Sequence, residues 1–170
     1  MPNLKDAIFC DLERELTVTR KVLAAVPADK FDWKPHVKSM SLGKLAIHIA
    51  TLPEWMTHTL AQDVLDFATA PRPPQSVADT AALLALFDDR AGALRQAVAT
   101  FDPAAWDAIW TMKNGAQIFT AQPRSKVFRV YDLNHMIHHR GQLCLYLRLL
   151  NVKVPTVYFN TADDPTFIFE

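Results

Sequence analysis

The chain has 170 residues, of which 50% are hydrophobic and 21% charged, and its 18 basic residues balance 18 acidic ones. This length and composition predict a single globular domain over residues 1–170, and the balanced charge argues against nucleic acid as a partner. No apolar run approaches the about 20 residues that span a bilayer, and the first residues lack a signal-peptide pattern, so a cytoplasmic protein without membrane contact is expected.

Two amphipathic helices are predicted in the first third of the chain. Across residues 4–26, apolar side chains recur every three or four positions, which is typical of a helix with one buried face. After a loop, Ser41 is a suitable N-cap for a second helix over residues 42–65, in which Pro53 is expected to cause a kink. His48 falls on the apolar side of this second helix and is therefore expected to point into the protein.

The rest of the chain combines two further helices with an irregular stretch. A third helix is predicted after Ser76, and a fourth over residues 125–150, with apolar side chains on opposite sides. Between them, Asn114 and Gly115 indicate a hairpin, although no other strand is evident for it to join. Four helices with short connections predict an all-α fold, namely a four-helix bundle with a short irregular or hairpin insertion before the last helix and an irregular C-terminal tail.

Histidines crowd into the fourth predicted helix. His135 and His139 are four residues apart, which places both rings on one face, about 40° apart in rotation. Two such imidazoles can bind one divalent ion at about 2.0–2.1 Å per nitrogen, and His48 on the second helix is the natural third ligand. His138 points about 60° away from His135. Histidines on an apolar face can also be hydrogen-bonded core residues, and this alternative stays open.

Three histidines without a fourth protein ligand are typical of a catalytic metal site, because structural zinc normally has four protein ligands. Such an ion can turn bound water or a thiol into a nucleophile near neutral pH, or it can polarise a carbonyl group. The ligands do not select the metal by themselves. Zinc or nickel is favoured, and manganese, cobalt or iron is also compatible.

Polar neighbours of these histidines are candidates for hydrogen bonds to the rings or to a substrate. Tyr131 and Gln142 lie beside His135 on the helical wheel, and Asp132 lies beside the other histidine of the pair. For Asp132, a solvent-facing or core-edge position is an equal alternative. Arg140 points away from the pair, so a structural ion pair is predicted for it.

The stretch "NHMIHHRGQLCLYLRLLNVKVPTVYFNTADD" contains a histidine, three residues, His-Arg-Gly-Gln, an apolar run, Val-Pro and a tyrosine. This order resembles the last helix and tail of the DinB-like (DinB/YfiT-like) proteins, a family of small metal-binding bundles. Upstream, "FDWKPHVKSMSLGKLAIHIATLPEW" is similar to the family's Trp-x-Pro loop and its second helix, which bears the first histidine. The resemblance covers essentially the whole chain and implies His48, His135 and His139 as metal ligands. The tail departs from the frequent Tyr-Gly-Pro-Ser-Ala-Asp of relatives, so no substrate role is inferred for it.

The resemblance also implies a reaction class, because relatives include enzymes that use a low-molecular-weight thiol in S-transfer or isomerisation. A metal-dependent, thiol-dependent S-transferase acting on a small molecule is therefore the first hypothesis. The alternatives are a metal-dependent hydrolase, a non-catalytic metal-binding stress protein, and an interacting bundle without metal.

A homodimer is also predicted, through the rear apolar face of the fourth helix. The same side chains could instead pack on another helix of their own chain. They are Leu133, Ile137, Cys144 and Leu147.

Overall fold

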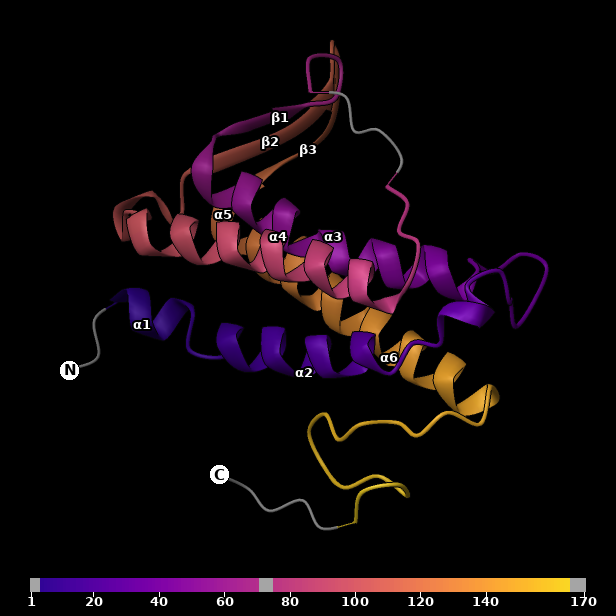
Figure 1. Cartoon of the computed structure of the whole chain (residues 1–170). Helices are drawn as coiled ribbons and strands as arrows, with labels where there is room; N and C mark the ends of the chain where they lie inside the picture. The colour runs from indigo at the N-terminus through magenta and orange to yellow at the C-terminus, as the bar shows by residue number, and fades with distance from the viewer. Residues whose placement is uncertain (1–3, 71–74, 166–170) are drawn as a thin grey trace.

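Four long helices form the body of the molecule in the computed structural model, which describes residues 4–70 and 75–165 (Figure 1). They are α2 (Leu12–Ala24), α3 (Leu42–Ala61), α4 (Thr80–Thr100) and α6 (Asn134–Leu149). α3 packs most extensively against α4 and also contacts α6, while α2 contacts α4 and α6. The packing of α3 on α6 brings the two predicted histidine segments together.

Two helices begin after a residue whose side chain caps their first turn. Ser41 precedes α3, and its hydroxyl accepts a hydrogen bond from the backbone N–H of Lys44 at 3.3 Å, so the predicted N-cap is confirmed. Asp79 caps α4 in the same way, accepting from the N–H of Ala82 at 2.8 Å. Pro53 lies inside α3 without ending the helix.

Two of the predicted helices are not regular α-helices throughout. The first consists of α1 (Leu4–Ile8) followed by α2. The predicted fourth helix is continuous from Arg124 to Leu149, but it changes type along its length: α5 (Arg124–Lys126) passes into the π-helix η3 (Val127–Leu133) and then into α6. Short 3₁₀ helices, η1 (Ala28–Lys30) and η2 (Pro103–Ala105), lie in the connections. The π-helix directly precedes the histidine pair, and π-helical turns are frequent at functional sites.

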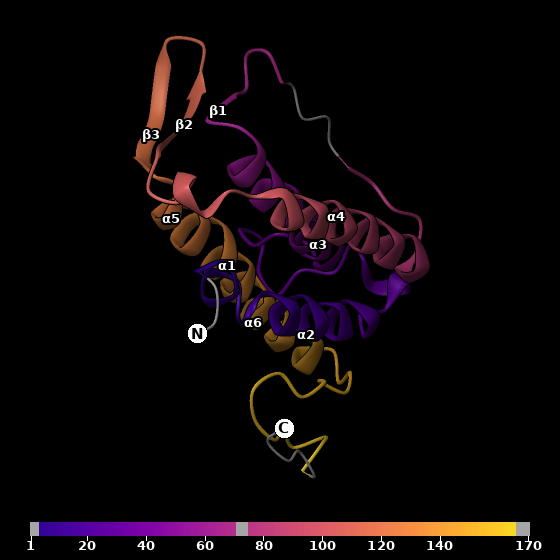
Figure 2. The same cartoon turned by 90° about the vertical axis from the view of Figure 1, so that its left-hand side faces the viewer.

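The all-α prediction is wrong, because a three-stranded sheet lies beside the bundle (Figure 2). Its strands are β1 (Val64–Asp66), β2 (Ile109–Asn114) and β3 (Gln117–Pro123). β2 pairs antiparallel with β3, and β1 pairs parallel with β2, in the order β1-β2-β3. The hairpin turns at Gly115, whose φ of +56° is a conformation that glycine adopts without strain. The insertion before the last helix is therefore part of a mixed sheet.

The sequence does not predict this sheet because β1 has no strand pattern of its own. The helical prediction extends to residue 65, whereas α3 ends at Ala61 and Gln62 is already extended, with φ −145° and ψ 163°. β1 is only three residues long, and its partner is distant in the sequence, since Val64 lies opposite Thr111. Only the folded chain brings these two segments together.

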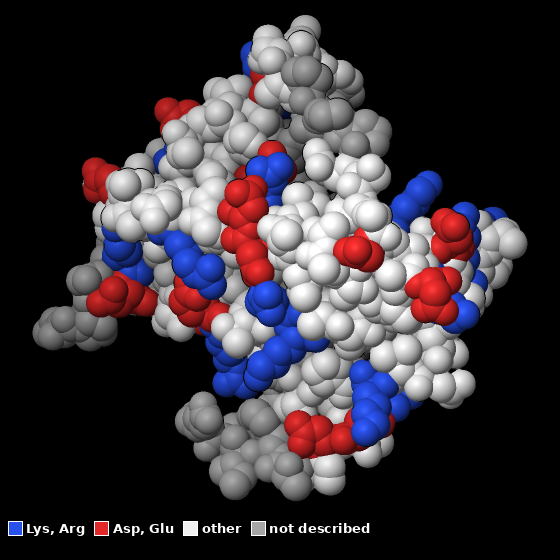
Figure 3. All heavy atoms as spheres, in the orientation of Figure 1, with Lys and Arg blue, Asp and Glu red and all other residues white. Residues whose placement is uncertain are grey.

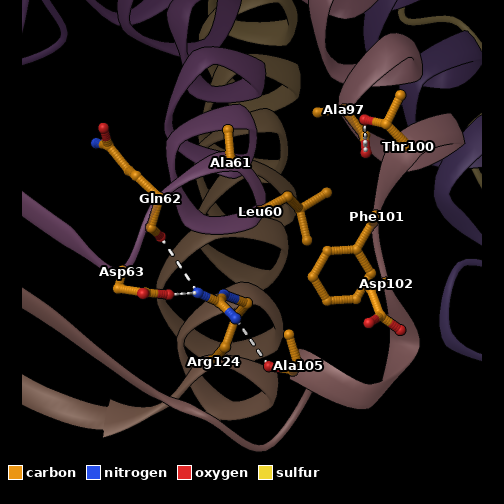
Figure 4. A pocket seen from close by; sticks show the side chains of 10 residues that line it. All are labelled: Leu60, Ala61, Gln62, Asp63, Ala97, Thr100, Phe101, Asp102, Ala105 and Arg124. Atoms are coloured by element: carbon orange, nitrogen blue, oxygen red, sulfur yellow. Dashed lines mark hydrogen bonds and ion pairs between the residues drawn. The ribbon is translucent and has the colours of Figure 1, made fainter.

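Arg124 joins the hairpin to the bundle from a buried position (Figure 4). Its Nε donates to the carbonyl of Thr59 at 2.7 Å, and its Nη1 donates to the carbonyl of Ala105 at 2.8 Å. Its Nη2 pairs with the carboxylate of Asp63. Because Thr59 lies in the last turn of α3, the guanidinium satisfies a carbonyl at the helix C-terminus, where the helix dipole favours a cation.

The main apolar core fills the bundle and includes the rear face of the helix formed by η3 and α6. Leu133 and Leu147 are buried in it, and Ile137 and Cys144 pack against it. These side chains therefore pack within one chain, as the intramolecular alternative requires, and the homodimer stays a prediction. A second, smaller cluster contains residues of β1, β2 and η3. It comprises Leu65, Trp110 and Val127.

Charged side chains of both signs are intermixed on the face drawn in Figure 3. Exposed ion pairs link α2 to α4, with Arg20 to Asp88 at 2.7 Å and Arg95 to Glu13 at 2.9 Å. Such exposed pairs contribute about 0–1 kcal/mol each. Within the part of the chain that the structure describes, no helix combines the length and the apolar character needed to cross a membrane.

The tail beyond α6 has no regular helix as far as residue 165 and is anchored to α2. The hydroxyl of Tyr158 donates to the carboxylate of Glu15 at 3.0 Å. The last residues of the predicted irregular tail, 166–170, lie outside the described residues.

Candidate metal centre

Three half-buried histidines converge where α3 packs on α6. The Nε2 of His48 lies 3.3 Å from the Nε2 of His135, which in turn lies 2.8 Å from the Nε2 of His139. Ligand atoms of the three rings all lie within 4.8 Å of one another. The structure thus brings together all three residues that the sequence predicts as metal ligands.

Hydrogen bonds at the far side of two rings decide which nitrogen carries the proton. The Nδ1 of His135 lies 3.2 Å from the backbone carbonyl oxygen of Tyr131, and the Nδ1 of His139 lies 2.7 Å from the Oε1 of Gln142. The carbonyl oxygen of Tyr131 can only accept, so the Nδ1 of His135 carries the proton when that ring is neutral, and with its amide in this orientation Gln142 favours the same tautomer of His139. Each Nε2 then presents a lone pair, and the two lone pairs face each other. A cation between them would turn this repulsion into attraction.

Burial favours the neutral form of two of the rings, those of His48 and His135. Loss of solvation, followed by the neighbouring imidazoles of His139 and His135, lowers the pKa of His48 from the ordinary 6.5 to about 4. Burial and then the charge of His139 also lower the pKa of His135. A neutral imidazole is the form that binds a metal ion, so the environment favours ligation at neutral pH.

The distances suit a tetrahedral ion. Bonds of about 2.0–2.1 Å in tetrahedral geometry separate the ligand nitrogens by about 3.3–3.4 Å. The Nε2 atoms of His48 and His135, at 3.3 Å, already have that spacing. Those of His135 and His139, at 2.8 Å, would need to move apart slightly. The three rings therefore fit a three-histidine site, and a fourth position would remain for water or a substrate.

The predicted neighbours of the histidines take different positions. Gln142 contacts His139, and Tyr131 reaches His135 through its backbone carbonyl while its side chain is 46% exposed. Asp132 is buried, and its Oδ2 accepts a hydrogen bond from the Thr59 hydroxyl at 2.7 Å. The solvent-facing alternative for Asp132 is therefore wrong.

Three further side chains of α6 lie outside the cluster of three histidines. His138 is exposed, and its ring centre is 5.0 Å from that of His139. Arg140 faces the opposite side and forms a buried ion pair with Glu15 at 2.6 Å, as predicted. Cys144 is half-buried, and burial raises the pKa of its thiol.

A cavity of about 340 Å³ adjoins the histidines. Most of its wall comes from the sheet, α3 and η3, and His135 belongs to the wall. The other lining residues are Trp55, Trp110, Met112, Phe119, Thr120, Val127, Tyr131 and Asp132. Sequence reasoning missed the contribution of the hairpin, namely Trp110, Met112, Phe119 and Thr120. Its only sequence signal was the apolar alternation on either side of Asn114 and Gly115.

Another cavity, of about 400 Å³, has no comparable chemistry (Figure 4). It lies between the ends of α3 and α4, and none of its lining residues is a histidine or a cysteine. The only basic residue in its wall is Arg124, whose guanidinium already pairs with Thr59, Ala105 and Asp63.

A sequence model of the DinB family matches residues 1–166. The chain belongs to the DinB family. Two solved DinB-like proteins resemble this DinB family member in fold. One, from Bacillus cereus ATCC 10987, is 20% identical with a TM-score of 0.67, and the match covers 90% of this chain and 97% of that chain. The other, from Bacillus subtilis, is 18% identical with a TM-score of 0.70, over 89% of this chain and 97% of that chain. No curated protein matches the sequence.

Proposed function

We propose that this DinB family protein is a metal-dependent enzyme that holds one divalent ion through the Nε2 atoms of His48, His135 and His139. The observation that carries the proposal is the convergence of acceptor nitrogens whose opposite ring nitrogens are already engaged. Mutually facing lone pairs are costly in a half-buried place unless a cation lies between them. Zinc or nickel suits three imidazoles best, and manganese, cobalt and iron are compatible.

When bound, such an ion lowers the pKa of a water or thiol in its open position. The residues of the chain orient the histidine rings and exclude water from one side of the site. The Tyr131 carbonyl and the Gln142 amide hold two rings in the tautomer that exposes Nε2. The apolar walls of the adjoining cavity exclude water from one side of the site.

The finer proposal is a transferase that joins a low-molecular-weight thiol to a small electrophile. The cavity beside His135 offers the electrophile a mostly apolar wall close to the position of the thiolate. In the transfer, the thiolate sulfur forms a bond to carbon, the leaving group departs with its electron pair, and the thiol proton passes to solvent.

The first test is the metal content of protein purified without an affinity tag, measured by mass spectrometry. About one equivalent per chain is expected in the parent and almost none in His48→Ala and His139→Ala. The matched control is His138→Ala, which removes an exposed neighbouring imidazole and should keep the metal. No metal in the parent after incubation with zinc and nickel, or equal loss in the His138 variant, would contradict the three-histidine site.

The second test separates enzyme from metal-binding stress protein. Metal-loaded protein is mixed with a low-molecular-weight thiol and an activated aryl halide, and the loss of free thiol is followed. The transferase predicts turnover that disappears in His139→Ala and persists in His138→Ala. A loaded site that protects against unfolding but consumes no thiol would favour the stress protein. Turnover of an activated ester without thiol would favour the hydrolase.

A further inference from the structure

The hairpin forms part of the cavity beside His135, mostly through one face of its two strands. Side chains of successive strand residues alternate between the two faces of a sheet. Trp110 and Met112 of β2 are two residues apart, and Thr120 of β3 lies opposite Met112, so these three side chains share a face and line the cavity. Phe119 directly precedes Thr120 and should face away by this rule, yet it lines the same cavity.

A β-bulge in the hairpin accounts for this exception. Met112 lies opposite Thr120, but one residue further along β2, Lys113 lies opposite Ile118. Phe119 is therefore an extra residue of β3 that has no counterpart in β2. Bulges of this kind redirect a side chain and are frequent next to active sites. Ile118 keeps the outward direction, since it is 61% exposed and does not belong to the cavity wall.

Contacts from β1 and the residue after it hold the hairpin in this register. The Oδ1 of Asp66 accepts a hydrogen bond from the N–H of Gly115 at 2.9 Å, and its Oδ2 pairs with the Nζ of Lys113 at 3.4 Å. The ring centre of Phe67 lies 6.1 Å from that of Phe119. Because Phe67 does not line the cavity, it supports the Phe119 ring from outside.

The cavity has room for one small apolar group. Its volume of about 340 Å³ is at the small end of the about 300–1,000 Å³ that ligand pockets occupy. Trp55 and Met112 give it flat and polarisable walls, on which an aromatic ring packs well. Phe119 is 48% exposed and Tyr131 is 46% exposed, so both lie where the cavity meets solvent. A substrate that reacts at His135 would place its apolar part against these side chains.

We propose that the substrate carries an apolar group of about one aromatic ring, that this group binds in the cavity, and that Phe119 limits its size. The inference deepens the proposed function and rests on it for the claim that the bound molecule is a substrate. Phe119 is then a specificity-determining residue, which the bulge turns into the cavity. The two helices with the histidines hold the ion, and β3 selects the molecule that reaches it. Removal of the Phe119 ring should admit a two-ring group.

The test uses cobalt-loaded protein and three thiols, namely ethanethiol, phenylmethanethiol and 2-naphthylmethanethiol. Cobalt is compatible with three imidazoles, and the absorption of a cobalt–thiolate bond reports binding without turnover. In the parent, phenylmethanethiol should bind about 10-fold more tightly than ethanethiol and also more tightly than the naphthyl compound. Phe119→Ala should weaken the phenyl compound about 3- to 10-fold and strengthen the naphthyl compound, so that their order reverses.

The matched control is Ile118→Ala, which removes an exposed apolar side chain from the neighbouring position of β3 and should keep the parent's order. A general loss of stability would weaken all three thiols and would not reverse the order. If Phe119→Ala fails to fold, Phe119→Leu should shift the same ratio in the same direction by a smaller factor. The inference is overturned by equal binding of ethanethiol and phenylmethanethiol, by an unchanged order in both Phe119 variants, or by the same reversal in Ile118→Ala.

A chain that takes up no cobalt would overturn the proposed function, and the inference is then decided in metal-free protein. Benzyl alcohol and 2-naphthylmethanol are titrated while ¹³C NMR follows the methyl groups of the five methionines. The Met112 signal, assigned by its loss in Met112→Leu, should move upfield in the ring current of the bound group. The same size order and the same reversal in Phe119→Ala are expected. A Met112 signal that responds to neither alcohol would overturn the inference as well, so the two failures are distinguishable.

Discussion

Two consecutive residues of α6, His139 and Arg140, point to different sides of the helix and belong to different polar clusters. Arg140 enters a closed network, in which its guanidinium pairs with Glu15 at 2.6 Å and donates to the Tyr158 hydroxyl at 2.6 Å and the Thr19 hydroxyl at 3.1 Å. His139, one position earlier, belongs to the cluster of three histidines. The near partners of the Nε2 atoms in this cluster are one another. Both clusters join α6 to another helix, namely α2 for Arg140 and α3 for the histidines.

The difference distinguishes a polar cluster that supports the fold from one that could hold a metal ion. In the Arg140 cluster, each charge has a partner from the chain itself, so adding a ligand would gain nothing. In the histidine cluster, the outer nitrogens of two rings have partners from the chain, whereas the inner Nε2 atoms face one another. Satisfied hydrogen bonding therefore marks the structural cluster, and unsatisfied acceptors mark the candidate site.

The largest expected effect comes from breaking the closed cluster. Arg140→Ala leaves Glu15 buried without its cation, and the loss of a buried partner costs about 3–5 kcal/mol. Urea unfolding should show this loss while metal content per folded chain stays the same. The control is Arg20→Ala, which breaks an exposed pair and should cost less than about 1 kcal/mol. Similar costs for both variants would remove the distinction between the clusters.

Removing the metal tests the open cluster. With free ion at about 1,000 times its dissociation constant, binding to the native state adds about 4 kcal/mol to stability, and a chelator should remove this amount. Thermal melts with and without chelator measure the effect. In His48→Ala the same chelator should leave the melting temperature unchanged. A parent protein that is insensitive to both added metal and chelator would argue against ligation by the cluster.

Two glycines show the same contrast in packing: Gly43 lies in a tightly packed place, and Gly141 lies in open space. A Cβ added at Gly43 would lie 2.9 Å from the Cβ of Phe31, so Gly43→Ala should cost about 1–3 kcal/mol by overpacking. A Cβ at Gly141 would meet nothing within 4 Å, and Gly141→Ala should stabilise α6 by about 0.5–1 kcal/mol. Urea midpoints of the two variants should therefore move in opposite directions.

The smallest effect concerns pH. The folded pKa of His48 lies below its unfolded value, so the unfolded chain takes up a proton that the folded chain refuses. The contribution of this histidine to the stability of metal-free protein is therefore complete above pH 6.5 and is lost as the pH falls toward 4. Urea midpoints between pH 7.5 and 5 should decline less steeply in His48→Gln. An equal slope in both proteins would show that His48 does not resist protonation.

Local sequence patterns predicted the parts of this protein that local forces control. The histidine spacing on α6, the N-cap at Ser41 and the apolar face of α3 each depend on helical periodicity and on nearest neighbours. The same reasoning placed Arg140 away from the histidines, and the structure has it there. Because a helical face is a property of a short segment, its sequence is sufficient to predict it.

Tertiary structure decided what depends on distant segments. β1 becomes a strand only because Val64 meets Thr111 across the chain, and the hairpin then places Trp110 in the wall beside His135. The packing of α3 on α6 brings the Nε2 of His48 within 3.3 Å of that of His135. Sequence alone thus determined which side chains could form a metal site and on which helices they lie. Their convergence, and the cavity next to them, came from long-range packing, whose pairings leave no local periodicity to read.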